Sequence, residues 1–303
     1  MNMNQKRKVR AEKKNDDNQL GINWFPGHMT RTRRQIEAQL KLVDAVAEIA
    51  DARIPYSSRN PELGNIISGK PRLLLLNKSD MADPAATAEW IKVSSDKNVP
   101  AIAVDCRNGK GLNNFKNAVK EILSDKLRSY EEKGMAGKPL RVMVVGIPNV
   151  GKSSFINRIA GAGRAKVENR PGVTRGNQWF TVDRQLELLD TPGVLWPKFE
   201  DKTVGEHLAF TGAVSDRVVD TELLAVRLLE LLCRNYLDLI KERYGVENQS
   251  GDYYEALCNI GKKRGMMMRG GEVDSERAAN MLLEEFRNCR LGKITLERAE
   301  DYA

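Results

Sequence analysis

A glycine-rich segment near the middle of the chain carries residues suited to holding phosphate groups. Residues 146–153 read GIPNVGKS and match GxxxxGK[ST], with the apolar run RVMVV before them and the helical pattern SFINRIA after them. Such a loop points backbone N–H groups at a phosphate, and the following helix N-terminus adds its dipole. Lys152 would contact the β- and γ-phosphates, and the Ser153 hydroxyl would ligate Mg²⁺. The predicted nucleotide contacts of this loop are Asn149, Val150, Gly151, Lys152, Ser153 and Ser154.

A second motif, DTPG at residues 190–193, follows the apolar strand pattern LELL. A carboxylate at the end of a strand is the usual partner of a phosphate loop and holds Mg²⁺, here through water. We therefore predict Asp190 as a Mg²⁺ residue and the Gly193 N–H as a donor to the γ-phosphate. Thr174, in RPGVTRG between the two motifs, is placed to ligate Mg²⁺ when a γ-phosphate is present. Lys152, Thr174 and Gly193 are accordingly the predicted catalytic contacts of the transferred phosphate.

The choice of base is predicted from NKSD at residues 77–80, directly after the strand pattern RLLLL. The Asp80 carboxylate can accept hydrogen bonds from both the N1–H and the 2-amino group of guanine, a pair that adenine lacks. A site built around those two donors rejects the wrong base strongly, because the carboxylate would be left unpaired. Asn77 would reach the purine and tie the motif to the phosphate loop, and the Lys78 stem would pack on the ring.

A fifth motif, DCRNGKG at residues 105–111, resembles the turn whose backbone N–H meets the guanine O6 atom in GTPases. That turn usually reads Ser-Ala-Lys, and here Asp105 and Cys106 replace the serine and the alanine. Because the contact is made by the backbone, we expect it to survive this change.

The elements that must position these motifs alternate between strand and helix, which predicts an α/β fold with a doubly wound, mostly parallel sheet. Strand patterns cover residues 43–55, 72–76, 100–104, 141–145, 179–182 and 185–189. Helical patterns cover residues 29–42, 85–92, 111–130, 153–160, 221–236 and 275–290. We expect a disordered basic arm over residues 1–21, a nucleotide-binding domain over 22–200 and a small all-helical domain over 201–303.

Composition sets further limits. The 303 residues favour two domains, and the net charge of +8 divides into +12 before Thr203 and −4 from there on. This asymmetry favours a polyanionic partner reached mainly from the front half. Four well-separated cysteines and two histidines exclude a zinc knuckle, an iron–sulfur cluster and a disulfide scaffold. Neither a membrane span nor a signal peptide is expected, so we predict a cytoplasmic location.

The order of the motifs is unusual, because the guanine motifs precede the phosphate loop, whereas a Ras-like domain has them after it. The chain therefore resembles the circularly permuted GTPases and, more closely, the ribosome biogenesis GTPase A family. The resemblance covers about residues 22–296 and rests on NWFPGHM, DARIP, SSRNP, NKSD, GIPNVGKSS, RPGVTRGNQW, LLDTPGVLWPKFED and GKKRG. It implies a cytoplasmic bacterial GTPase with a permuted Ras-like domain that binds the precursor of the large ribosomal subunit and assists its late assembly.

The resemblance also bears on catalysis. Ras-like enzymes orient the attacking water with a glutamine after the DxxG motif, but Val194 occupies that position here. The resemblance points instead to His28 in PGHM as a catalytic residue, although a histidine beside proline and glycine is also typical of a structural turn. In related GTPases an asparagine at the position of Asn149 accompanies K⁺ use. The alternative interpretation is that Asn149 stabilises the turn of the loop.

Contacts with ribosomal RNA are predicted at two basic clusters: Arg31, Arg33 and Arg34, and Lys262, Lys263, Arg264 and Arg269. DTPG runs through residues 195–201 into the helical domain, so GTP could bias that domain's orientation, with Trp196 as the anchor. We expect a monomer that binds neither DNA nor membranes. An alternative function is a GTP-switched RNA-binding or signalling module outside ribosome assembly. Less favoured are an ATPase, which Asp80 argues against, and a tRNA-modifying GTPase.

Overall fold

The computed structural model describes residues 27–135, 137–161, 178–191, 193, 201–214, 219–246 and 251–302, and the side chains from Arg33 onward. Six strands form one sheet in the order β3-β2-β1-β4-β6-β5. All neighbours are parallel except β5 and β6, which are antiparallel. The predicted mostly parallel sheet is therefore confirmed. The strands are β1 (Ala45–Asp51), β2 (Arg72–Asn77), β3 (Ala101–Ala103), β4 (Leu140–Val145), β5 (Gln178–Asp183) and β6 (Leu186–Asp190).

Side chains that alternate along a strand enter different layers, as the pleat requires. Ala47 and Ile49 of β1 pack in one cluster with Phe115 and Phe155, whereas Val46 packs with Ile36 in another. Both faces of the sheet are thus covered by helices, which explains why its strands read as continuous apolar runs. The helices of this part are α2 (Gly27–Leu40), α3 (Pro61–Ile67), α4 (Pro84–Asp96), α5 (Phe115–Ile122), α6 (Ser124–Glu132) and α7 (Lys152–Ala160), with the 3₁₀ turn η1 (Leu112–Asn114).

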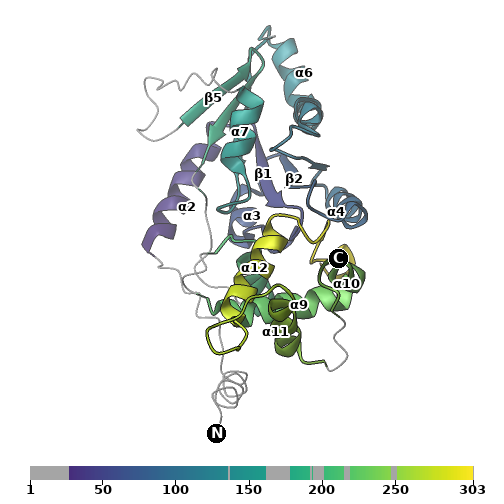
Figure 1. Ribbon diagram of the computed structural model, residues 1–303. Coiled ribbons are helices and arrows are strands. Elements are labelled where there is room, and N and C mark those ends of the chain that lie inside the picture. Colours follow the sequence, from purple (N-terminus) through teal and green to yellow (C-terminus); the bar gives the residue numbers. More distant parts are fainter. Residues whose placement is uncertain are drawn as a thin grey trace.

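The rest of the described chain is mostly helical and lies at the end of the sheet region where α3 and α4 are found (Figure 1). Four of its five helices begin with an aspartate whose side chain accepts hydrogen bonds from the first turn, the usual N-cap arrangement. One apolar cluster continues from the α5 and α7 face of the sheet into these helices. They are α8 (Lys202–Phe210), α9 (Thr221–Asn235), α10 (Leu237–Tyr244), α11 (Tyr253–Lys263) and α12 (Ser275–Arg287).

The last described residues return to the sheet region and end in the 3₁₀ turn η3 (Ala299–Tyr302). Figure 1 shows this end of the chain beside α4 and α10. The Tyr302 ring stacks on Tyr56 at a centroid distance of 4.2 Å, and the Trp90 indole N–H donates to Glu297 O at 3.0 Å. We call residues 291–302 the C-terminal strap.

Element boundaries differ from the sequence patterns in three ways. The strand predicted over 43–55 ends at Asp51, because the N–H groups of Asp51 and Arg53 donate to the side chains of Ser58 and Asp51 instead of to a neighbouring strand. The helix predicted over 111–130 is divided into η1, α5 and α6, with Leu123 leaving helical backbone angles. The helices α3, α8, α10 and α11, of seven to eleven residues, were not predicted.

Within the described residues, no helix has the length and apolarity needed to span a membrane. The four cysteines are free thiols, with Cys106 buried and the other three partly buried. The basic arm expected over residues 1–21 lies outside the described residues.

Candidate nucleotide-binding site

The carboxyl ends of four parallel strands bring the predicted motifs to one edge of the sheet, where ligands bind in open α/β folds. NKSD lies at the end of β2, the 105–111 turn follows β3, the phosphate loop follows β4, and DTPG lies at the end of β6. In the sheet, β4 lies between β1 and β6, and β2 lies on the other side of β1. The guanine motif and DTPG are therefore on opposite sides of the phosphate loop. Neighbours in space are therefore independent of the order in the chain, which is why the fold accommodates a circular permutation.

The phosphate loop adopts a backbone that requires glycine at two points. Gly146 has φ 154°, and a Cβ there would lie 2.6 Å from the Ile49 carbonyl oxygen. Gly151 has φ 102°, and a Cβ there would collide with the Asn77 side-chain amide. The loop therefore packs tightly on the ends of β1 and β2, and its shape depends on both neighbours.

Lys152 begins α7, and its ammonium group donates to the carbonyl oxygens of Gly146 and Ile147 at 3.0 and 2.9 Å. Burial lowers the pKa of Lys152 to about 8, against the raising effect of the Asp190 carboxylate. A Cβ on Gly193 would lie 2.9 Å from the Lys152 Nζ atom, so DTPG and the phosphate loop are in contact. A phosphate bound here would contact the Lys152 ammonium group, whose charge the protein only partly compensates.

Two oxygen groups beside Lys152 fit a magnesium ion by their chemistry. The Ser153 side chain is exposed and has no hydrogen-bond partner among the described residues. Asp190 is partly buried, and burial raises the pKa of its carboxyl group against the opposing effect of Lys152. Mg²⁺ prefers hydroxyl, carboxylate and water oxygens, and a divalent ion would relieve the buried charge of Asp190. The adjacent Ser154 is also exposed.

The guanine motif is held on both sides. The Asn77 side chain donates to Val150 O at 2.7 Å and accepts from the Cys106 N–H at 3.1 Å, so it joins the phosphate loop to the 105–111 turn. Lys78 has φ 62°, and its ammonium group pairs with Asp51 at 2.8 Å. The Asp80 carboxylate is half-buried and has no hydrogen bond or ion pair within the described part of the chain. It is therefore available to a ligand.

The 105–111 turn is closed by its own first residue. The buried Asp105 carboxylate accepts from the Arg107 N–H at 2.8 Å and from the Asn108 N–H at 3.1 Å. The Cys106 N–H donates to Asn77, and burial raises the pKa of the Cys106 thiol to about 12. Asp105 therefore shapes the turn, and a guanine carbonyl would have to share the Cys106 N–H with Asn77.

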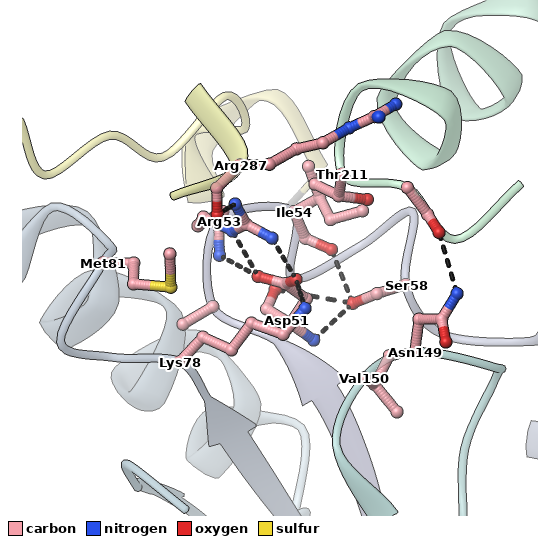
Figure 2. Close-up of polar contacts among 12 residues, drawn as sticks. Asp51, Arg53, Ile54, Ser58, Lys78, Met81, Asn149, Val150, Thr211 and Arg287 are labelled. Carbon is pink, nitrogen blue, oxygen red and sulfur yellow. Dashed lines mark hydrogen bonds and ion pairs between the residues drawn. The ribbon is translucent and has the colours of Figure 1, made fainter. Parts of the chain in front are cut away.

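Asn149, the predicted K⁺ ligand, contacts the helical part. Its side-chain amide N–H donates to Gly212 O, just after α8, at 2.8 Å (Figure 2). Asn149 also has φ 63°, a left-handed conformation that asparagine tolerates better than most residues. The side-chain oxygen has no partner among the described residues and remains available.

A buried charge cluster below the guanine motif was given no role by sequence reasoning. Arg53 donates to Asp51 through two nitrogens at 3.0 and 2.9 Å, and it also reaches Arg287 O at 3.3 Å (Figure 2). Although burial by itself would raise it, Arg53 and Lys78 hold the pKa of Asp51 well below its usual range. The signal in the sequence was the motif DARIP, in which two opposite charges follow a buried strand.

Several predicted residues lie outside the described residues or differ in role. Thr174, Val194 and Trp196 are not described, and of His28 only the backbone, in the first turn of α2, is described. In the C-terminal basic cluster, Lys263 donates to the carbonyl oxygens of Tyr244 and Gly245, so it stabilises the end of α10.

The remaining described residues of the two basic clusters divide into those with a partner in the protein and those without one. Arg33 pairs with Glu37 at 3.1 Å, and the Arg264 guanidinium lies 5.6 Å from the centre of the Tyr244 ring. The exposed side chains of Arg34, Lys262 and Arg269 have no polar partner within the described part. Among the described side chains of the two predicted clusters, these three are available to an anion.

Taken together, the permuted α/β sheet, the phosphate loop with its lysine and the free carboxylate of NKSD define a GTPase of the phosphate-loop class.

Known proteins match the chain along most of its length. A family model described as "50S ribosome-binding GTPase" matches residues 141–248. The Ribosome biogenesis GTPase A of Bacillus licheniformis is 44% identical over 280 residues, which cover 92% of this chain and 99% of that protein. Among solved structures, the GDP-bound structure of the protein named TM YlqF matches with a TM-score of 0.65 and 27% identity. The match covers 88% of this chain and 100% of that one. GNP-bound YlqF from T. maritima has a TM-score of 0.61 and 25% identity, covering 88% and 98%. The chain belongs to the ribosome biogenesis GTPase A family.

Proposed function

We propose that this GTPase binds the precursor of the large (50S) ribosomal subunit in the cytoplasm, promotes its late assembly, and hydrolyses GTP to GDP and phosphate there. The proposal is supported by the family to which the chain belongs. The observation that carries the nucleotide part is the Asp80 carboxylate, which is half-buried and has no hydrogen bond or ion pair within the described residues, in a motif that Asn77 joins to the phosphate loop.

In this proposal each half of the site has its own task. Asp80 accepts hydrogen bonds from the guanine edge, Asn77 holds the base motif against the phosphate loop, and Lys78 packs on the ring. Lys152 and the inward backbone N–H groups bind the β- and γ-phosphates. Ser153, Asp190 and Thr174 hold Mg²⁺, which when bound offsets the charge that develops on the phosphates. The Gly193 N–H binds the γ-phosphate.

The attacking water needs a partner other than residue 194, because a valine side chain cannot polarise water. We assign this role to His28, in keeping with its place in PGHM. Exchange of His28→Ala should lower the ribosome-stimulated kcat and leave the affinity for GTP nearly unchanged, as expected for an interaction made only in the transition state. Equal stimulated rates in the two proteins would remove His28 from the mechanism.

Asn149 is the proposed K⁺ residue. The free side-chain oxygen supports this role, while the amide N–H is already held by Gly212. GTP turnover measured in KCl and in NaCl tests it: the K⁺ stimulation should disappear in Asn149→Ala. Equal turnover of the unmodified protein in the two salts would mean that Asn149 serves only to shape the loop.

Binding to the ribosome is proposed to use rRNA phosphates, met by Arg31 and Arg34 in α2 and by Lys262 and Arg269 beyond it. The test is co-sedimentation with large subunits at low salt, with a non-hydrolysable GTP analogue and with GDP. Lys262→Glu should weaken both complexes similarly, because phosphate contacts are independent of the nucleotide. A chain that binds RNA but never co-sediments with large subunits would favour an RNA-binding switch outside ribosome assembly.

A further inference from the structure

The C-terminal strap lies against the two loops that follow β1 and β2. The Ile294 N–H donates to Met81 O at 3.1 Å, and the Leu296 N–H donates to Arg53 O at 2.8 Å. Ile294 and Leu296 are both buried. The strap therefore forms a backbone-bonded layer directly behind the guanine motif, although it is more than 200 residues away in the chain.

Thr295 is the residue of the strap at which three elements meet. Its hydroxyl donates to Ala52 O at 3.2 Å and accepts from the Asp83 N–H at 3.1 Å, which bridges the two loops. Its backbone is held from the helical part: the Tyr236 hydroxyl donates to Thr295 O at 2.8 Å and accepts from the Thr295 N–H at 3.1 Å. Thr295 is 1% exposed, so its own hydroxyl and backbone groups depend on these protein partners.

These contacts fix the turn that carries Asp80. The turn is closed by a hydrogen bond from the Met81 N–H to Lys78 O at 2.9 Å. On its N-terminal side the turn is held by the ion pair between the Lys78 ammonium group and the Asp51 carboxylate, at 2.8 Å. On its C-terminal side it is held by the strap, through Met81 O and the Asp83 N–H. A further anchor is Ser79, whose N–H and hydroxyl donate to Val104 O at 3.2 and 3.0 Å. The Asp80 carboxylate itself has no hydrogen bond or ion pair among the described residues, so its position depends on the anchors of the turn.

We propose that Thr295, held by Tyr236, is a positioning residue for guanine recognition, so that the helical part and the strap complete the base pocket. Hydrogen bonds lose strength steeply with misalignment, and Asp80 has to meet two donors at once. A small shift of the turn would therefore weaken the contact with the 2-amino group more than it weakens binding of the phosphates. The inference rests on the proposed reading of guanine by Asp80.

The test compares GDP with IDP, whose base lacks the 2-amino group, by calorimetric titration of the full chain. Thr295→Val keeps the volume of the side chain and removes only the bridging hydroxyl. We expect it to shrink the ratio of GDP to IDP affinity about fivefold, the equivalent of roughly one net hydrogen bond. Tyr236→Phe should shrink the ratio in the same direction, because it releases the backbone of Thr295.

Ser94→Ala is the matched control. The Ser94 hydroxyl is also buried and donates to Val99 O at 2.6 Å, but it lies in the last turn of α4, away from the guanine motif. It should lower the melting temperature without changing the ratio. An unchanged ratio in Thr295→Val, or in Tyr236→Phe should Thr295→Val not fold, would overturn the inference. An unmodified protein that does not discriminate GDP from IDP would instead refute the reading of guanine by Asp80.

Discussion

The two halves of the nucleotide site lie side by side at one edge of the sheet, yet they are held in opposite ways. On the base side, Asn77 and Lys78 are bound to other parts of the protein, and a buried ion pair lies beneath them. On the phosphate side, the Ser153 hydroxyl is exposed, and Asp190 keeps a partly buried charge that Lys152 compensates only in part.

This difference separates two tasks. A base pocket held by protein contacts has its recognition geometry before the ligand arrives, which favours selectivity. A phosphate site whose charges are incompletely paired gains most when phosphate and metal bind, which favours sensing of the nucleotide. The Asn149 contact with Gly212 then offers a direct connection from the sensing half to the helical part.

The largest effect is expected from breaking the buried pair on the base side. Arg53→Met leaves the Asp51 carboxylate, 2% exposed as a residue, without its main partner. We expect a loss of about 3 kcal/mol in the free energy of unfolding, the lower end of the usual cost of removing one partner from a buried ion pair, because Lys78 still pairs with Asp51. Urea denaturation measures it. Arg128→Met, which removes an exposed pair with Asp125, should cost less than about 1 kcal/mol. Similar losses in the two variants would show that the base side is not held by its ion pair.

Asp80→Asn tests the selectivity of the base side. The unmodified protein should bind GDP at least about a thousandfold better than ADP, a gap of roughly 4 kcal/mol. The variant should lose most of that gap and prefer xanthine nucleotides, because an amide can donate to the extra carbonyl of xanthine. Its stability should be unchanged, since Asp80 has no hydrogen bond or ion pair among the described residues. Competition titrations with GDP, ADP and XDP decide the matter, and unaltered GDP binding would contradict the assignment.

The phosphate side should respond to pH through Lys152. Without nucleotide the pKa of Lys152 is lowered to about 8. A bound phosphate should raise this pKa again, because its negative charge favours the charged ammonium group. The complex therefore takes up a proton when it forms above about pH 8, so affinity for GDP should fall as pH rises, by up to about tenfold per pH unit. Lys152→Arg, which stays charged, should remove this slope. Titration from pH 7 to pH 9.5 checks it, and a flat profile in the unmodified protein would indicate that Lys152 is fully protonated before binding.

The smallest effect is expected at Ser153. Ser153→Ala should reduce the gain in GDP affinity that Mg²⁺ provides by about fivefold, the equivalent of roughly 1 kcal/mol. Affinity measured with EDTA should not change, because the backbone N–H groups remain. Ser154→Ala removes the neighbouring exposed hydroxyl and serves as the control, with no change in the Mg²⁺ effect. Equal losses in the two variants would mean that neither hydroxyl acts through the metal.

Local motifs were predictable because their chemistry is contained in a few adjacent residues. The left-handed backbone at Gly146 and Gly151, the helix beginning at Lys152 and the turn after β2 follow from residue types and spacing. The parallel sheet followed from the alternation of apolar strands and helices. For the same reason the Asp105 turn could be located, although the bond between Cys106 and Asn77 was not foreseen.

Other roles were decided only by tertiary packing. Lys263 belongs to a basic run in the sequence, yet it bonds to the end of α10. Thr295 and Asn149 reach partners in other elements, and neither periodicity nor a charge run marks those contacts. The physical reason is that a hydrogen bond between distant segments depends on how apolar layers stack. The sequence determined which groups lie at the end of each strand, and packing determined which of them remain free for a ligand.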